Sequence, residues 1–313
     1  MVLPSFRILE MELDYHPEAR GITVRRPQLK LLEDVPFPAW VAGNWETVKN
    51  FQAKPDDLLI ATYPKAGSTW MQEIVDLISQ NGDVVMCKRA PIYRRVPVLE
   101  YFMDNTLPTG TGVLAKMESP RMMKTHLPIQ LVPKSFWEQD CKTILVARNA
   151  KDSLVSYFHF HRTCNLMPEP GTWHKFSQKF MEGKVSFGPW YDHVKGWWEA
   201  KDKHRILFLF YEDIKENPRR EILKVAEFME KVVEEDVIEK IVHLSSFKVM
   251  KDNPMANYTT LPASIMNQNI SRFMRKGQVG DWKNHFTVSQ NEDFDEHYER
   301  QMVNSSLKFR NVL

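Results

Sequence analysis

The segment TYPKAGSTW, residues 62–70, combines residue types that hold a phosphate group in proteins. Lys65 contributes a positive charge, and Gly67 allows the backbone to approach a ligand closely. Ser68 and Thr69 add hydroxyl donors at the expected start of a helix, where unpaired backbone N–H groups attract an anion. The G-x-x-x-x-G-K-[ST] spacing of a P-loop is absent, because the lysine precedes the glycine. The segment predicts an anion site, with an ordinary capped helix as the alternative.

The segment KTHLP, residues 124–128, places a lysine and a histidine two positions apart at the end of an expected strand. Side chains two apart on a strand point to the same face, so we expect Lys124 and His126 on one side of the sheet. Histidine is the side chain most readily used as a base near neutral pH. The pair predicts acid–base chemistry, and the alternative is a structural histidine beside a surface lysine.

The segment VARNAKDSLVSYFHF, residues 146–160, ends a strand at Arg148 and continues as a helix. Arginine is well suited to bind a phosphate through two parallel hydrogen bonds. Asp152, Ser156 and Phe160 follow at intervals of four residues and share one face of that helix. We expect this face to border the same ligand as Arg148; the alternative for Ser156 is a small residue chosen for close packing.

The segment FMRKGQVGDWKNHFT, residues 273–287, places two cations beside a glycine turn. Arg275, Lys276 and Gly277 form a plausible backbone nest for a second phosphate, with a solvated basic loop as the alternative. The four segments together describe a ligand with two separate anionic ends. None contains an acidic cluster placed to bind Mg²⁺ as in P-loop enzymes, so we predict no metal.

Four short apolar runs that alternate with amphipathic helical stretches must position these segments. This order is typical of an α/β fold: a single domain with a central parallel sheet flanked by helices and a P-loop-like turn after its first strand. We expect an irregular N-terminal tail over residues 1–35 and the domain over residues 36–313. The expected strands cover residues 58–63, 121–125, 144–148 and 206–211.

Ligands of such folds bind beyond the carboxyl ends of the parallel strands. Lys65, Lys124, Arg148 and Tyr211 all lie at or just after an expected strand end. The fold therefore predicts that side chains from distant parts of the sequence meet at one edge of the sheet.

Composition limits the partners and the compartment. The 313 residues carry 42 Lys and Arg against 40 Asp and Glu, a net charge of +2, which provides no overall field for nucleic acid. Cys87, Cys141 and Cys164 are too widely spaced for a Cys-x-x-Cys zinc site or a disulfide framework, and reduced thiols are typical of the cytoplasm. The sequence also lacks a signal peptide and a membrane-spanning apolar run. We expect a cytoplasmic protein with no membrane or nucleic-acid partner.

Together with the segment LFLFYEDIKENPRREI, residues 207–222, these motifs resemble the cytosolic sulfotransferases, and most closely the phenol-type branch of animals. The resemblance extends from about residue 36 to the C-terminus. It implies a single α/β domain that transfers a sulfonate group from 3′-phosphoadenosine 5′-phosphosulfate (PAPS) to the hydroxyl of small phenolic acceptors, including xenobiotics.

The resemblance also implies a role for each matching residue. It assigns PAPS binding to Lys65, Gly67, Ser68, Thr69, Trp70, Arg148, Ser156, Tyr211, Ser245, Phe247, Met274, Arg275, Lys276 and Gly277. It assigns the acceptor pocket to Val98, Tyr101, Lys124, His126, Phe160, Cys164, Leu166, Tyr258, Ile265 and Phe273. The implied catalytic set is His126, Lys65, Lys124 and Ser156.

The implied mechanism is an in-line displacement at sulfur. His126 removes the acceptor proton, Lys65 neutralises the leaving phosphate, and Lys124 stabilises the sulfonyl oxygens. Ser156 is expected to hold Lys65 away from the donor until an acceptor is bound. Two alternatives are a P-loop-type nucleotide kinase and a non-catalytic nucleotide-binding protein. The missing P-loop spacing disfavours the first, and a base that a mere binding protein does not need disfavours the second.

A short pattern near the C-terminus, KxxxTVxxxE, matches the dimerisation motif of the family. It is formed by Lys283, Thr287, Val288 and Glu292. The resemblance therefore predicts a homodimer with a small symmetric contact, and the alternative is a loop and helix start without a partner.

Overall fold

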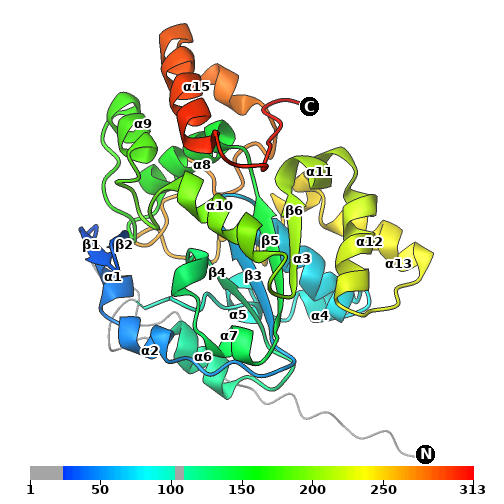
Figure 1. The fold of residues 1–313 in the computed structure, drawn as a ribbon. Helices are drawn as coiled ribbons and strands as arrows, with labels where there is room; N and C mark the ends of the chain where they lie inside the picture. Colours follow the sequence, from blue (N-terminus) through cyan, green and yellow to red (C-terminus); the bar gives the residue numbers. More distant parts are fainter. Residues whose placement is uncertain (1–23, 103–108) are drawn as a thin grey trace, which may run out of the picture.

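A four-stranded parallel sheet forms the centre of the protein, with the strand order β4-β3-β5-β6 (Figure 1). The computed structural model describes residues 24–102 and 109–313. All five residues of β3 are buried, as expected for a parallel strand covered on both faces. The four predicted strands are confirmed within one or two residues at each end: β3 (Leu58–Thr62), β4 (Met122–Thr125), β5 (Lys142–Ala147) and β6 (Ile206–Phe210).

The register of the sheet brings the carboxyl ends of three strands to one edge. Ala61 in β3 lies opposite Thr125 in β4, and Thr62 lies opposite Val146 in β5. The residues that follow these three strands therefore leave the sheet side by side, which is the position where α/β folds bind ligands.

Helices flank this sheet and contribute to one continuous hydrophobic core. In Figure 1, α3, α12 and α13 lie together to the right of the sheet, whereas α8 and α9 lie to its upper left. The α-helices are α1 (Ala39–Ala42), α2 (Trp45–Lys49), α3 (Ser68–Ser79), α4 (Val84–Cys87), α5 (Ile92–Arg95), α6 (Gly110–Lys116), α7 (Ser135–Glu138), α8 (Ala150–Thr163), α9 (Trp173–Met181), α10 (Trp190–Ala200), α11 (Tyr211–Glu216), α12 (Pro218–Phe228), α13 (Glu235–Leu244), α14 (Phe247–Met250) and α15 (Val288–Met302). Two 3₁₀ helices are η1 (Ile129–Leu131) and η2 (Asp281–Asn284).

Asparagine caps fix the starts of two helices that the sequence predicted. The Asn149 side chain accepts from the backbone N–H of Asp152, which begins α8 directly after β5. Asn217 caps α12 in the same way, with Pro218 in the first turn. Both arrangements satisfy a backbone donor that a helix start leaves unpaired.

The irregular tail predicted over residues 1–35 contains a strand. β1 (Leu29–Leu32) pairs antiparallel with β2 (Val35–Pro38) through a two-residue turn. Glu33 and Asp34 form that turn with positive φ angles of 47° and 65°, a conformation that tight hairpins require. The sequence prediction was wrong for this part because the turn lacks the usual Asn or Gly. Residues 1–23 of the predicted tail lie outside the described residues.

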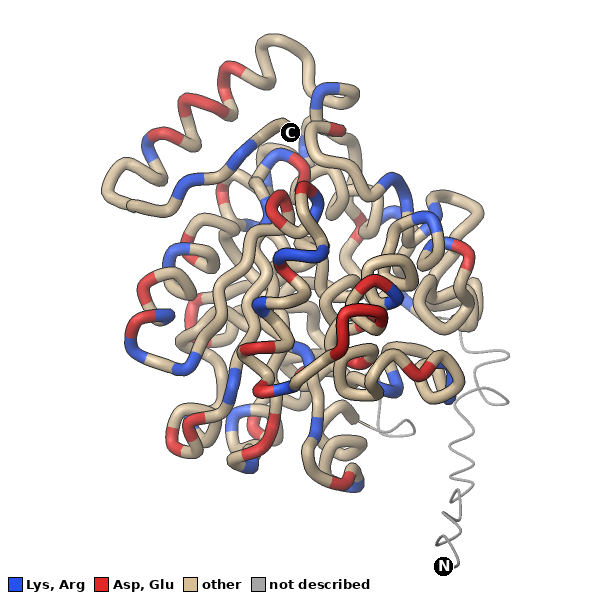
Figure 2. The backbone as a smooth tube through the Cα atoms, turned by 90° about the vertical axis from the view of Figure 1, so that its right-hand side faces the viewer, with Lys and Arg blue, Asp and Glu red and all other residues tan. Residues whose placement is uncertain are grey.

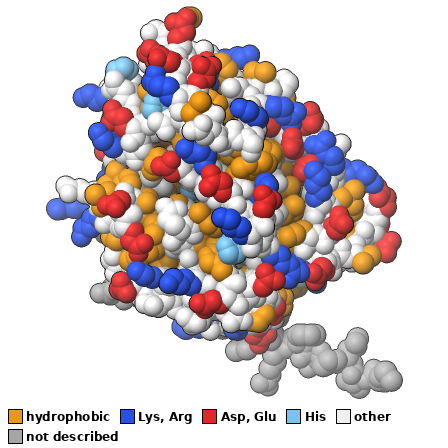
Figure 3. Space-filling model, viewed as in Figure 1, with side chains coloured by type: hydrophobic (Ala, Val, Ile, Leu, Met, Phe, Trp, Pro, Cys, Tyr) orange, Lys and Arg blue, Asp and Glu red, His pale blue; other side chains and the backbone are white. Residues whose placement is uncertain are grey.

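Charges are distributed over the chain rather than gathered on one side. Figure 2 shows Lys and Arg interspersed with Asp and Glu, and Figure 3 shows no broad area of one sign on the face it presents. Cys87, Cys141 and Cys164 are buried free thiols. Within residues 24–102 and 109–313, no helix has the length and apolar character needed to cross a membrane.

Candidate active site

One cavity of about 320 Å³ opens at the carboxyl edge of the sheet. All the residues that the sequence assigned to the donor site, the acceptor pocket and the catalytic set line this cavity. They come from the turn after β3 and the start of α3, the segment 98–101, the ends of β4 and β5, the helix α8 with the residues that follow it, the starts of α11 and α14, and the segment 258–278. The fold therefore brings the predicted residues together, while their individual roles remain predictions.

The turn between β3 and α3 is shaped to receive an anion. Gly67 has a φ angle of 113°, and a Cβ atom there would lie 3.0 Å from the Tyr211 ring, so a side chain at this position would be strained. Gly67 provides no side-chain cap for α3, whose first backbone N–H groups therefore remain available. Among the described residues, the buried Thr69 hydroxyl and Trp70 indole nitrogen also have no hydrogen-bond partner. These donors fit an anionic ligand.

Arg148 lies at the end of β5 and faces the same turn. Its guanidinium lies 4.3 Å from the centre of the Tyr211 ring and donates to the Gln278 carbonyl at 2.8 Å. The buried Nε atom of Arg148 has no partner among the described residues. An arginine fixed in this way and still holding a free donor fits the phosphate role that the sequence predicted.

His126 follows β4 with one ring nitrogen fixed. Nδ1 lies 2.9 Å from the carbonyl oxygen of Thr62 and 3.1 Å from the hydroxyl of the same residue. The carbonyl can only accept, so the shorter contact is a hydrogen bond in the tautomer whose Nδ1 carries the hydrogen. Nε2 is then left with a free lone pair on a residue that lines the cavity. Burial, and next the Lys124 cation, hold the pKa of His126 well below its ordinary value of 6.5. His126 is therefore neutral at physiological pH and able to accept a proton.

A buried carboxylate, Glu100, fixes the backbone around His126. It accepts from the backbone N–H of His126 at 2.8 Å and from the Thr125 hydroxyl at 2.9 Å. Thr125 thus points away from the cavity while Lys124 and His126 on either side of it face the cavity, as strand alternation predicts. Burial raises the pKa of the Glu100 carboxyl.

Two lysines approach the cavity beside aromatic rings. The Lys124 ammonium lies 3.4 Å from the Tyr258 hydroxyl. The Lys65 ammonium lies 3.6 Å from the centre of the Phe273 ring and 4.6 Å from that of Phe160. Burial, and then the charges of Lys124 and neighbouring arginines, lower the pKa of Lys65 to about 7. Lys65 and Ser156 both line the cavity, but no hydrogen bond joins their side chains in this structure. The expected restraint of Lys65 by Ser156 is therefore not seen here.

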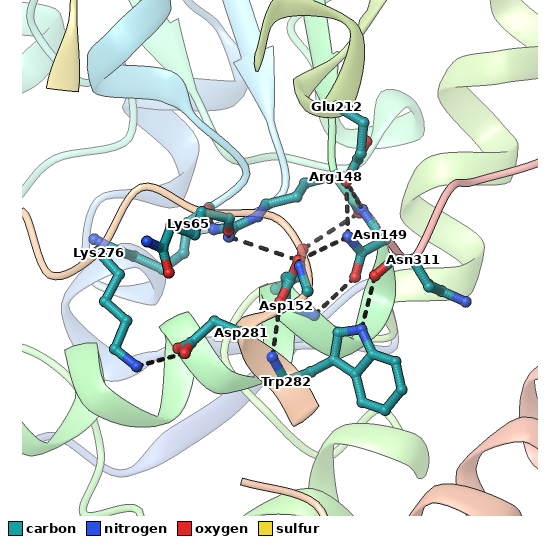
Figure 4. A network of polar contacts seen from close by, with 12 residues as sticks. Lys65, Arg148, Asn149, Asp152, Glu212, Lys276, Asp281, Trp282 and Asn311 are labelled. Atoms are coloured by element: carbon teal, nitrogen blue, oxygen red, sulfur yellow. Dashed lines mark hydrogen bonds and ion pairs between the residues drawn. The ribbon is translucent and has the colours of Figure 1, made fainter. Parts of the chain in front are cut away.

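The loop before η2 supplies the second pair of cations. Gly277 has a φ angle of 61°, and a Cβ atom there would lie 2.3 Å from the Phe247 ring, so only glycine fits. Arg275 and Lys276 both line the cavity and both form ion pairs with Asp281. Figure 4 shows that the network continues through Asp152 to Arg148.

The sequence did not identify a further set of cavity residues. Most lie in loops and short helices without a motif, and only Lys215, one helical turn after Tyr211, had a spacing that could have revealed it. The residues are Trp40, Pro64, Tyr93, Arg94, Pro97, Gly110, Val113, Met167, Phe187, Lys215, Met250, Leu261, Met266 and Gln278. In the part of the chain that the structure describes, no three His, Cys, Asp or Glu side chains are grouped to hold a metal ion.

Comparison with known proteins identifies the family. The family profile described as "Sulfotransferase domain" matches residues 55–306. The chain belongs to the sulfotransferase family. It is 55% identical to rat (Rattus norvegicus) "Sulfotransferase 1 family member D1" over 93% of this chain and 99% of that protein. It is 56% identical to human (Homo sapiens) "Sulfotransferase 1C2" over 90% of this chain and 95% of that protein.

Solved sulfotransferase structures share the fold. A mouse sulfotransferase, SULT7A1, complexed with PAP has a TM-score of 0.73 and 31% identity, and covers 88% of this chain and 95% of its own. A retinol dehydratase in complex with retinol and PAP has a TM-score of 0.78 at 22% identity, over 89% of this chain and 90% of its own, which supports the fold alone. Both confirm the predicted α/β architecture.

The lowered pKa of Lys65 predicts a proton linkage. A phosphate bound beside Lys65 favours the charged amine, so its pKa rises from about 7 on binding. At about pH 8, where the free amine is mostly neutral, binding of adenosine 3′,5′-bisphosphate should take up close to one proton. Calorimetry in two buffers of different ionisation enthalpy measures this uptake. The variant Lys65→Arg, which is always charged, should show none. Binding without proton uptake by the parent protein would contradict the prediction.

Proposed function

We propose that this sulfotransferase uses the cavity to transfer a sulfonate group from PAPS to the hydroxyl of small phenols. The observation that supports this most directly is the convergence of Lys65, Lys124 and a neutral His126 on one cavity. PAP, the adenosine 3′,5′-bisphosphate that such a transfer leaves behind, is bound in the mouse relative. The free donors of the β3–α3 turn and of Arg148 suit its two phosphate ends.

In this proposal, His126 acts as the general base. Its Nε2 accepts the proton of the phenol hydroxyl while the phenol oxygen forms a bond to sulfur and the bond between sulfur and the bridging phosphate oxygen breaks. A phenol has a pKa near 10, so a positioned base lowers the barrier. The Thr62 carbonyl, at 2.9 Å from Nδ1, stabilises the imidazolium that forms.

Lys65 and Lys124 stabilise the charge that moves during transfer. Lys65, beside the β3–α3 turn, neutralises the phosphate that leaves, and Lys124, beside His126, stabilises the sulfonyl oxygens. Burial strengthens both interactions because little water screens them. No hydrogen bond joins Ser156 to Lys65 in the free protein, so the proposed restraint belongs to the complex with PAPS: there Ser156 holds Lys65 until an acceptor binds, which limits hydrolysis of the donor.

We further propose that the acceptor pocket favours neutral phenols. Its predicted wall is largely apolar and aromatic, and the rings of Tyr258 and Phe273 lie 4.2 Å apart between their centres. Among the described residues that line the cavity, none is Asp or Glu. An ammonium group in the acceptor would therefore lose water without gaining a counter-ion.

The two alternatives have less support. A nucleotide kinase of the P-loop type does not follow from a sulfotransferase family match that covers residues 55–306. A non-catalytic nucleotide-binding protein would not need a histidine held in the neutral, proton-accepting form. We also propose a cytoplasmic location, which three buried free thiols support.

The role of His126 predicts a separation of turnover from donor binding. In His126→Ala, kcat should fall by about a hundred- to ten-thousandfold, the contribution of a general base, while the Kd for PAP stays within about twofold. Transfer from labelled PAPS to 4-nitrophenol and calorimetry with PAP measure the two quantities. His174→Ala, at an exposed position on α9, is the control and should behave as the parent protein. Near-normal turnover in His126→Ala would exclude the proposed base.

The apolar acceptor pocket predicts discrimination against amines. The kcat/KM for 4-nitrophenol should exceed that for dopamine. Because these two phenols also differ in acidity, 4-ethylphenol and tyramine form the sharper pair: they differ only by the amine, and 4-ethylphenol should be favoured by at least about tenfold. A ratio below one would reveal a negative group in the pocket.

The homodimer remains a proposal that the surface supports. Val288 is 77% exposed at the start of α15, in line with a contact that another copy covers. Thr287 also caps α15 by accepting from the backbone N–H of Gln290, so its place in the motif has a structural reason as well.

Light scattering should show a weak dimer for the parent protein and a monomer for Val288→Glu. Val232→Glu, at a valine that is 94% exposed on another surface, should remain dimeric. A dimer that survives Val288→Glu would place the interface elsewhere.

A further inference from the structure

One buried carboxylate holds both cations of the loop before η2. The Asp281 side chain accepts from Arg275 at 2.6 Å on one oxygen and from Lys276 at 2.5 Å on the other. Asn284 also donates to it at 2.8 Å, and the His285 ring nitrogen lies 3.9 Å away. Asp281 is only 3% exposed, and it is not among the residues that line the cavity. Asp281 therefore contacts two cations that line the cavity without lining the cavity itself.

The backbone on both sides of Asp281 is anchored to α8. The Asp152 carboxylate accepts from the N–H of Gly280 at 2.8 Å and from the N–H of Trp282 at 3.0 Å. The Trp282 indole donates to the carbonyl of Asn311 at 2.8 Å, and Figure 4 shows these contacts together. Asp281 is therefore held between two fixed residues, so its carboxylate has a defined position relative to α8.

Among the described residues, Asp281 is the one hydrogen-bond partner of these two cationic side chains, so most of their donors are unused. Arg275 has five N–H donors and Lys276 has three, and each gives one to Asp281. Both side chains remain accessible from the cavity, with 20% and 41% of their surface exposed. Burial opposes the charge of Asp281, but hydrogen bonds from Lys276, Asn284 and Arg275 outweigh it and hold the pKa of this carboxyl well below its ordinary value, so the carboxylate stays charged.

We propose that Asp281 is a positioning residue that orients Arg275 and Lys276 toward the 3′-phosphate of the donor. It does so without touching the donor, because it contacts the cations on the side away from the cavity. Flexible side chains bind phosphate more weakly when they must first be ordered, and Asp281 orders them in advance. This inference rests on the proposed function, since it assumes that the donor is PAPS.

The binding of two nucleotides, measured for the parent protein and for a variant, tests whether Asp281 positions the cations or only stabilises the fold. Adenosine 3′,5′-bisphosphate has the phosphate that Arg275 and Lys276 are proposed to bind, and adenosine 5′-phosphate lacks it. In Asp281→Asn, the Kd of the bisphosphate should rise by about tenfold, the effect of one charge-assisted hydrogen bond, while the Kd of the 5′-phosphate should stay within about twofold. Selectivity for the 3′-phosphate therefore falls.

Glu230 offers a matched control. Its carboxylate also bridges one lysine and one arginine, Lys142 at 3.0 Å and Arg205 at 2.5 Å, and none of these three residues lines the cavity. Glu230→Gln should change neither Kd. If Asp281→Asn does not fold, as judged by circular dichroism, Asp281→Glu provides the test: its carboxylate is displaced by one methylene, and selectivity should again fall below that of the parent protein.

The outcomes distinguish this inference from the proposed function. A parent protein that binds the bisphosphate, together with an Asp281→Asn variant of unchanged or higher selectivity, overturns the positioning role alone. Equal weakening of both nucleotides also overturns it, because that pattern indicates general damage to the site. A parent protein that fails to bind the bisphosphate overturns both proposals.

Discussion

In the described part of the chain, seven lysine and arginine side chains line one cavity, and much of the site follows from how the protein tolerates their charge. They are Lys65, Arg94, Lys124, Arg148, Lys215, Arg275 and Lys276, and no carboxylate lines the cavity among the described residues. Burial, and then the nearby charges of Lys124, Arg148 and Arg275, favour the neutral amine of Lys65 and lower its pKa to about 7. A polyanionic ligand removes this repulsion, so the free site already has the charge distribution that the ligand completes.

The compensating negative charges lie one layer behind the cavity. Asp281 pairs with the cations of its own loop, and Asp152 connects that loop to the start of α8. Glu100 has the corresponding place behind His126. Each carboxylate fixes the backbone or side chain of a cavity residue without entering the cavity. This separation keeps the lining positive toward a donor while the carboxylates hold the cavity residues in place.

The sequence was sufficient to predict the strands and the basic residues that line the cavity, but not the carboxylates behind them. Apolar runs identified β3 to β6, and the motifs placed Lys65, Lys124, Arg148 and Arg275 near strand ends or in one basic loop. Asp281 lies within the basic segment 273–287, but no known spacing rule predicts that its carboxylate pairs with Lys276 and Arg275, five and six residues earlier. Neither Glu100 nor Phe187 belongs to a helix or strand: tertiary packing brings Phe187 to His126, and an isolated bridge between Val98 and Lys124 brings Glu100 there. The β1–β2 hairpin was missed because Glu33 and Asp34 adopt positive φ angles without glycine.

That hairpin connects the N-terminal part of the chain to the surroundings of His126 through a short series of rings. Phe37 in β2 packs edge-on against Phe187 at 5.3 Å, and Phe187 packs edge-on against His126 at 5.5 Å. The backbone N–H of Phe187 also donates to the carbonyl of Pro36 at 2.8 Å. The consequence concerns recombination between relatives: a chimera that exchanges N-terminal segments keeps these native partners together when its crossover lies before β1 or after Phe187. A crossover between β2 and Phe187 joins rings of different ancestry beside His126.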